Sequence, residues 1–191
     1  MVLVGEEITP PDYHLLAVGI TDAISGERLA RTIDEVHRQG GVAIAAHPYE
    51  PFWPAYDAEA LQKLDGAEVV RPESQQDEAR ASQLREFFRR APLTAIGASD
   101  SRGLGPMGYS RTYVFARERT EQGVLDAVRD GRTVVYDRGR AYGDPALIEM
   151  AAANGTLDRD APDLPVPGGA RLFSRIAAVA GLVGVLLFNK W

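Results

Sequence analysis

Hydrophobic and polar segments alternate along the first 150 residues. Short apolar runs, typical of buried strands, are separated by longer segments in which apolar residues recur every three or four positions, as in helices that face a core. The runs that predict strands are Val2–Val4, His14–Ile20, Val42–His47, Ala67–Val70, Thr94–Ala98, Arg111–Phe115 and Thr133–Tyr136. The segments that predict helices are Glu27–Gln39, Asp57–Leu64, Gln75–Arg90 and Thr120–Asp130. This alternation is typical of α/β proteins with a largely parallel sheet or barrel.

The strand pattern also predicts how the sheet is arranged. We expect the first five strands to lie side by side and parallel in one curved sheet. The apolar run Val2–Val4 begins almost at residue 1, so this strand is expected at an open edge of the sheet. An edge strand exposes unpaired backbone groups, which favour pairing with another chain.

The pattern changes after residue 150. Residues 151–170 are rich in Pro, Gly and Asp and predict a linker, whereas Leu172–Phe188 is apolar except for Ser174 and Arg175. A helix that crosses a bilayer needs about 20 apolar residues. Residues typical of a membrane interface flank this segment, namely Arg171, Arg175, Lys190 and Trp191. We therefore expect residues 171–191 to anchor a cytoplasmic domain to a membrane. The alternative is a soluble cytoplasmic protein whose C-terminal helix docks on the domain.

Composition narrows the possible functions. The net charge of −6 and the lack of a basic stripe argue against binding to nucleic acid. The chain has no cysteine, which excludes disulfides and thiolate zinc sites. It has three histidines, and His37 lies among polar residues of a predicted helix, where we expect it to be a surface residue. Histidine ligands for a metal would therefore come from His14 and His47.

Four residues with metal-binding side chains lie at the ends or starts of apolar strands. They are Glu7, His14, His47 and Asp100. Imidazole and carboxylate groups suit zinc, manganese or iron, and the strand ends of a parallel α/β fold can converge on one rim. The sequence therefore predicts one divalent metal site built from these four side chains. Taken singly, a histidine at a strand end is more often a hydrogen-bonded structural residue.

The stretches "GEEIT", "HLLAVGI", "GGVAIAAHP" and "GASDS", in this order, resemble the PHP (polymerase and histidinol phosphatase) domain of metal-dependent hydrolases. The later "GYSRTYVFA", "AVRDGRTVV" and "YGDPALI" resemble its CehA/McbA-like branch. The resemblance covers roughly residues 2–148. It implies a distorted (β/α)7-type barrel, here incomplete at its N-terminus, with divalent metals at the carboxyl ends of the strands. It also implies hydrolysis of phosphoesters or, in some members, of carbamates and related bonds.

The resemblance assigns roles to individual residues. Glu7 matches the family's metal-bridging glutamate, and His14 and His47 match the histidines of the next strands. Asp100 matches the aspartate of the final Asp-x-His motif. Glu68 stands where a glutamate of the family approaches the site, although a solvated charge at a strand end is an equally good interpretation.

The sequence departs from the family in two places. The family opens with a strand that bears Asp-x-His-x-His, and no such motif occurs in this chain. In addition, Arg102 replaces the histidine of the final Asp-x-His motif. A guanidinium group stays charged and cannot bind a metal, but it can pair with Asp100 or with a bound anion.

Three interpretations are consistent with these residues. The first is a PHP-family phosphoesterase-type hydrolase, present here as a fragment with an incomplete metal site that acts on a small-molecule ester. The second is a degenerate, non-catalytic PHP domain that binds an anion or a partner, with Arg102 in place of a metal. The third is an unrelated α/β domain with accidental matches. Because a complete metal cluster is needed to activate water, we expect this chain to have weak hydrolytic activity or none.

Overall fold

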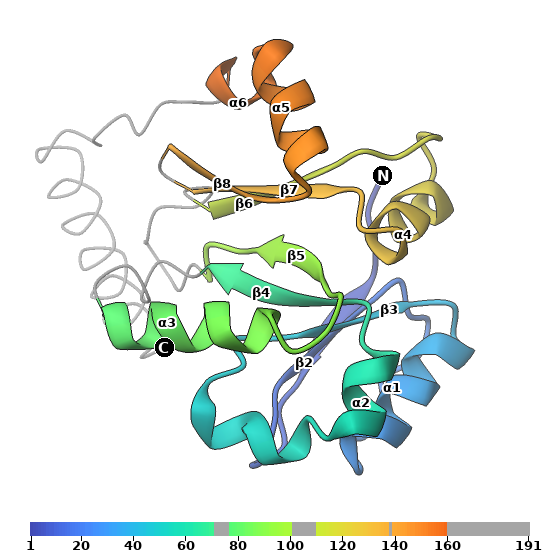
Figure 1. Cartoon of the computed structure of the whole chain (residues 1–191). Coiled ribbons are helices and arrows are strands. Elements are labelled where there is room, and N and C mark those ends of the chain that lie inside the picture. Colours follow the sequence, from blue (N-terminus) through green and yellow to red (C-terminus); the bar gives the residue numbers. More distant parts are fainter. Residues whose placement is uncertain (71–76, 101–109, 138, 160–191) are drawn as a thin grey trace, which may run out of the picture.

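Two sheets and their flanking helices make up the computed structural model, which describes residues 1–70, 77–100, 110–137 and 139–159 (Figure 1). The larger sheet has the order β1 (Gly5–Ile8), β2 (Leu15–Val18), β3 (Val42–Ala45), β4 (Gly66–Val70), β5 (Thr94–Gly97). The smaller sheet has the order β6 (Ser110–Val114), β7 (Thr133–Asp137), β8 (Arg140–Gly143). The predicted α/β class is confirmed. No barrel is found among the described residues, so barrel closure stays a prediction.

All four predicted helices are present. They are α1 (Leu29–Arg38), α2 (Ala58–Lys63), α3 (Glu78–Phe88) and α4 (Glu121–Arg129). The side chains of Asp57, Asp77 and Thr120 accept backbone N–H groups at the starts of α2, α3 and α4, which fixes where these helices begin. The sequence pattern missed β8, the 3₁₀ helix η1 (Glu50–Ala55), α5 (Pro145–Ala153) and α6 (Thr156–Arg159).

The prediction of five parallel strands is wrong for β2. β2 runs antiparallel to both β1 and β3, while β3, β4 and β5 are parallel to one another. The link from Ile8 to Leu15 is too short for a crossover, which needs a dozen or more residues. Beyond β2, the backbone N–H of Gly19 donates to Val4, and Glu27 accepts from Tyr13 near the other end of the strands. After β2 the chain therefore runs back toward the start of that strand. Helix α1 then brings it to the opposite end, so that β3 begins beside the end of β2.

The first strand also begins later than predicted. Residues 2–4 form no strand, and β1 begins at Gly5, which pairs with Val18. Val2 and Val4 are 80% and 61% exposed, so their β-branched side chains do not contribute to the core. Among the described residues β1 pairs with β2 alone, and it therefore forms an edge of the sheet, where we expected the first strand to lie.

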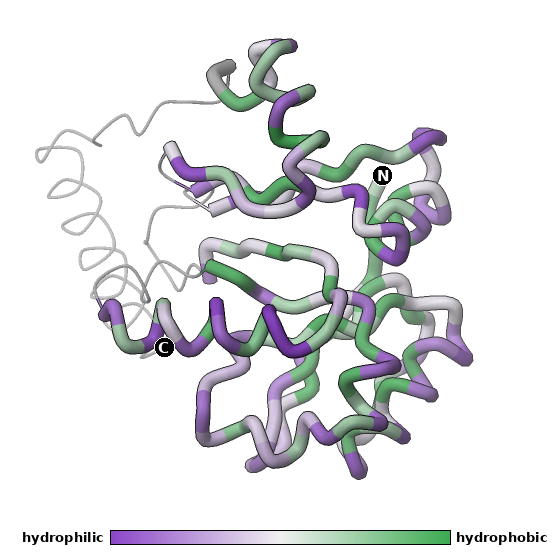
Figure 2. Tube along the Cα trace, viewed as in Figure 1, coloured by the Kyte–Doolittle hydropathy of each residue, from purple (hydrophilic) through white to green (hydrophobic). Residues whose placement is uncertain are grey.

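The larger sheet is covered on both faces. One face packs against α1, α2 and α3 through a cluster that includes Leu15, Ile33 and Phe87, all fully buried. The opposite face contacts α4, where Ile44 packs with Leu125. Figure 2 shows the corresponding pattern, with hydrophobic residues along the central strands and mostly hydrophilic residues on α3. β3 is therefore buried on both faces, which explains its uninterrupted apolar sequence.

Replacing Tyr13 with phenylalanine should lower the free energy of unfolding by about 1 to 2 kcal/mol. Tyr13 is fully buried, and its hydroxyl donates to the carbonyl of Glu27 and shares a hydrogen bond with Thr32. Urea denaturation of Tyr13→Phe and wild type measures the loss. Tyr142→Phe is the control, because no hydrogen bond of its hydroxyl is found within the described part of the chain, and it should cost much less. Equal effects of the two variants would contradict the assigned hydrogen bonds.

Two threonines join the smaller sheet to β5. The hydroxyl of Thr112 donates to the carbonyl of Gly97 and accepts the N–H of the same residue, both at 2.9 Å. The hydroxyl of Thr133 donates to the carbonyl of Ala95 at 2.7 Å. These hydroxyl groups occupy backbone positions that a further strand would otherwise pair with, so they protect this edge of the larger sheet.

The predicted linker begins too early. Residues 151–153 belong to α5 and residues 156–159 form α6, and Ala151 and Leu157 are buried against Val134 of the smaller sheet. The reason is that "PALIEMAAA" contains enough apolar residues to pack on β7, although the following residues are polar. The rest of the linker and the predicted anchor at 171–191 lie outside the described residues. Within the described ranges, no helix has the length and apolar character needed to span a bilayer.

Candidate metal centre

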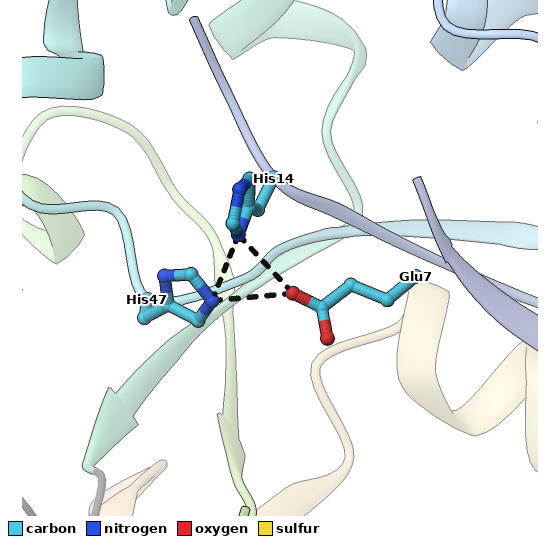
Figure 3. Close-up of side chains that lie close together, drawn as sticks. All are labelled: Glu7, His14 and His47. Carbon is cyan, nitrogen blue, oxygen red and sulfur yellow. Dashed lines mark hydrogen bonds and ion pairs between the residues drawn. The ribbon is translucent and has the colours of Figure 1, made fainter. Parts of the chain in front are cut away.

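Three predicted ligands converge on one point (Figure 3). Nδ1 of His14 lies 3.1 Å from Nε2 of His47 and 3.2 Å from Oε1 of Glu7. Nε2 of His47 lies 3.2 Å from the same oxygen. The three atoms therefore form a nearly equilateral triangle. They are the one group of at least three potential metal ligands that is found among the described residues.

Hydrogen bonds alone do not satisfy this triangle. A carboxylate only accepts, and each imidazole nitrogen either donates or accepts. If both nitrogens carry a proton toward Glu7, the two N–H groups oppose each other; if only one does, the lone pair of the other nitrogen faces the carboxylate. With Glu7 ionised, every assignment leaves at least one unfavourable contact. A divalent cation, by contrast, accepts all three lone pairs at once.

The triangle also has the size of a coordination site. Metal–nitrogen and metal–oxygen bonds of roughly 2.0 to 2.2 Å place neighbouring ligands roughly 3 Å apart in an octahedron and roughly 3.4 Å apart in a tetrahedron. The observed distances of 3.1 and 3.2 Å fall between these values. The three side chains therefore fit a single zinc, manganese or iron ion without rearrangement.

Strand register brings the three ligands together. Ile8, Leu15 and Ala45 lie side by side on β1, β2 and β3. Glu7 lies within β1, His14 directly precedes β2, and His47 follows β3 by two residues. Because β2 runs antiparallel to its two neighbours, the start of β2 lies at the same end of the sheet as the last residues of β1 and β3. Thus the strand direction that the sequence failed to predict is what places His14 in the site.

An aromatic wall packs on the two histidines. It consists of Tyr49 and Phe52, which lie at and within η1. The Phe52 ring stacks on His14 with 4.9 Å between the ring centroids, and the Tyr49 ring stacks on His47 at 6.0 Å. The side chain of His47 is 11% exposed, against 36% for Glu7. The wall therefore shields the histidines, while Glu7 is the most exposed of the three residues. Glu7 also lines a separate cleft of about 400 Å³ with Glu6 and Ile24, which neither histidine lines.

A hydrogen bond to the main chain holds His14 in place. The hydroxyl of Tyr56 donates to the carbonyl of His14 at 2.7 Å. Burial raises the pKa of Tyr56, and the negative charge of Glu68 raises it further, so this phenol stays protonated and keeps donating. The sequence pattern did not point to Tyr49, Phe52 or Tyr56. The aromatic run "YEPFWPAY" directly after "AAHP" was the signal that could have found them.

The other predicted site residues have different surroundings. Asp100 follows β5 with a positive φ of 37° and is not one of the three converging ligands. Glu68 is buried on β4, 4% exposed, and its carboxylate accepts the backbone N–H of His47. Arg102 lies outside the described residues. His37 is exposed, as predicted, and contacts Asp65 at 2.8 Å.

Comparisons with known proteins agree with the α/β fold. No family model matches the chain. Over 70 residues the chain is 34% identical to an uncharacterized protein of Methanocaldococcus jannaschii, and the match covers 36% of this chain and 41% of that protein. A two-domain protein of Bacteroides vulgatus containing a predicted PHP-like metal-dependent phosphoesterase has a crystal structure similar to this one, with a TM-score of 0.58 and 22% identity.

The extent of the structural match limits what it shows. It covers 77% of this chain but 48% of the Bacteroides protein, so the chain spans about half the length of that protein. At this identity the likeness shows that the two share a fold.

Proposed function

We propose that this chain carries the metal-binding centre of a PHP-like, metal-dependent phosphoester hydrolase. In this proposal Glu7, His14 and His47 bind one divalent ion of zinc, manganese or iron. The observation that carries the proposal is the triangle of ligand atoms, which hydrogen bonds do not satisfy while Glu7 is ionised and which has the size of a coordination site. The fold shared with a protein that contains a predicted phosphoesterase of this kind supports the reaction class.

The surroundings of the triangle suit hydrolysis. A bound divalent ion would lower the pKa of a water molecule and polarise the scissile phosphoryl group. Phe52 and Tyr49 shield the histidine side, whereas Glu7, the most exposed of the three residues, leaves its side of the triangle open to a small ester. Asp100 and Arg102, which follow β5 in the sequence, belong to the proposal as a further ligand and an anion-binding residue. The proposal also includes the distorted barrel, with both sheets as parts of it.

Equilibrium dialysis should detect one zinc or manganese ion per chain. Glu7→Gln should weaken binding strongly, because the amide is a poorer ligand than the carboxylate but occupies the same space. Glu6→Gln is a matched control, since Glu6 is the neighbouring carboxylate on β1 and accepts the backbone N–H of Ile24 instead. Wild-type protein that binds neither metal would refute the proposed centre. Equal losses in the two variants would show that binding reflects surface charge alone.

A second experiment tests the reaction class. We expect slow hydrolysis of p-nitrophenyl phosphate that depends on added manganese or zinc and is abolished by Glu7→Gln. The rate should be low because three ligands hold one ion rather than the pair that clamps both oxygens in a fast displacement. A metal-loaded protein no faster than Glu7→Gln would contradict the hydrolase assignment. If the metal-free protein bound phosphate instead, the anion-binding interpretation would be favoured.

A further inference from the structure

We infer that Glu68 is a positioning residue of the metal centre, because it fixes His47 through the main chain rather than by binding the ion. This inference rests on the proposed function and adds a residue whose role the sequence left open. Glu68 lies on β4, the strand next to β3, and one of its carboxylate oxygens lies 2.7 Å from the backbone nitrogen of His47. The bond therefore joins the two strands at the point where β3 ends.

The burial of Glu68 makes this bond strong. The residue is 4% exposed and is paired in register with Ile96, a residue of the apolar cluster beneath α4. A buried carboxylate is costly unless it is hydrogen-bonded, and a hydrogen bond from an N–H to an ionised group is about twice as strong as a neutral one. The carboxylate of Glu68 thus accepts a charge-assisted hydrogen bond from the N–H group of His47, which lies beyond the end of β3.

The conformation of His47 shows why such a restraint is needed. Its φ is +29°, and it directly precedes Pro48, two conditions that few L-residues combine. A strained backbone of this kind persists only where its surroundings hold it, and it is found most often at functional sites. The turn at His47 directs its imidazole toward Glu7 and His14 (Figure 3). Relaxation of this turn would move Nε2 away from the triangle.

Cobalt(II) binding, followed by its visible absorption, tests the inference on the full chain. Glu68→Ala should bind cobalt about 10- to 100-fold more weakly, the usual cost of removing an outer partner of a metal ligand. The cobalt that still binds should have an altered spectrum, because the imidazole of His47 is displaced. Glu68→Gln should bind within about threefold of wild type, since its amide oxygen still accepts the N–H of His47, although without the charge.

Thr94→Ala provides the matched control. Thr94 is buried on β5, and its hydroxyl donates to the carbonyl of Val128 at 2.6 Å, away from the three ligands. This variant should lose stability but keep its cobalt affinity and spectrum. A purely structural role for Glu68 predicts instead that Glu68→Ala behaves like Thr94→Ala.

The outcomes separate this inference from the proposed function. If wild type binds one cobalt ion and folded Glu68→Ala binds it equally well, the inference is overturned while the metal centre stands. If Glu68→Ala fails to fold, Glu68→Gln decides. A folded Glu68→Gln protein that has lost its cobalt would overturn the inference, because Glu68 would then be a ligand itself. Wild-type protein that binds no cobalt overturns the proposed function and the inference together.

Discussion

Replacing His47 with alanine should weaken zinc binding by more than about 100-fold. This loss is larger than the roughly 10- to 100-fold loss that follows when a hydrogen-bond partner of a metal ligand is removed. His47 contributes one corner of the ligand triangle and is its least exposed member, with 11% of its side chain accessible. Without it, Glu7 and His14 provide two ligands, fewer than the three that catalytic zinc sites take from the protein. Competition with a chromophoric chelator measures the affinity of each protein for zinc.

Two further variants make this experiment specific. His47→Asn keeps a residue that tolerates positive φ but lacks the reach of an imidazole, so it should lose zinc as alanine does without adding backbone strain. His37→Ala removes a histidine that contacts Asp65 and lies outside the triangle, and it should bind zinc like wild type. Retained affinity in His47→Asn, or an equal loss in His37→Ala, would contradict the assigned site.

The sequence predicted where the ligands lie along the chain better than how they meet in space. Hydrophobic periodicity located the strands because burial determines it residue by residue. It therefore identified His14 and His47 as residues at strand boundaries. Periodicity carries no information on strand direction, since a buried strand has the same pattern when parallel or antiparallel to its neighbour. The prediction for β2 was wrong for this reason, and it is the antiparallel direction of β2 that brings His14 to the ends of β1 and β3.

Features set by long-range contacts were also beyond the sequence pattern. The position of Phe52 against His14 depends on how η1 folds back over the end of β3. The hydrogen bond from His47 to Glu68 joins residues 21 positions apart on neighbouring strands. Asp100 follows an apolar run and has a positive φ, just as His47 does, yet it is not one of the three converging ligands. A strand-end pattern gives the place of such a residue in the sequence and not the direction of its side chain.

Replacing Gly97 with alanine should destabilise the protein by about 3 kcal/mol, the upper part of the usual range for overpacking a core. A Cβ atom at this position would lie 2.3 Å from Cγ1 of Val135 and 2.7 Å from Oγ of Ser110. β5 would have to move away from the smaller sheet, which would also strain the two hydrogen bonds between Thr112 and Gly97. For a chain of this size, we expect the melting temperature to fall by about 10 °C.

The same variant also tests whether a change at β5 affects the metal centre near β1, at the other edge of the larger sheet. β5 lies at the opposite edge from β1, so zinc binding by Glu7, His14 and His47 should survive in folded Gly97→Ala at a temperature below its transition. Gly40→Ala serves as a comparison, because its φ is +82° but no atom lies within 4 Å of an added Cβ. Backbone strain alone should cost it about 1 kcal/mol. If Gly97→Ala melted no lower than Gly40→Ala, the smaller sheet would not pack on β5 as it does in Figure 1.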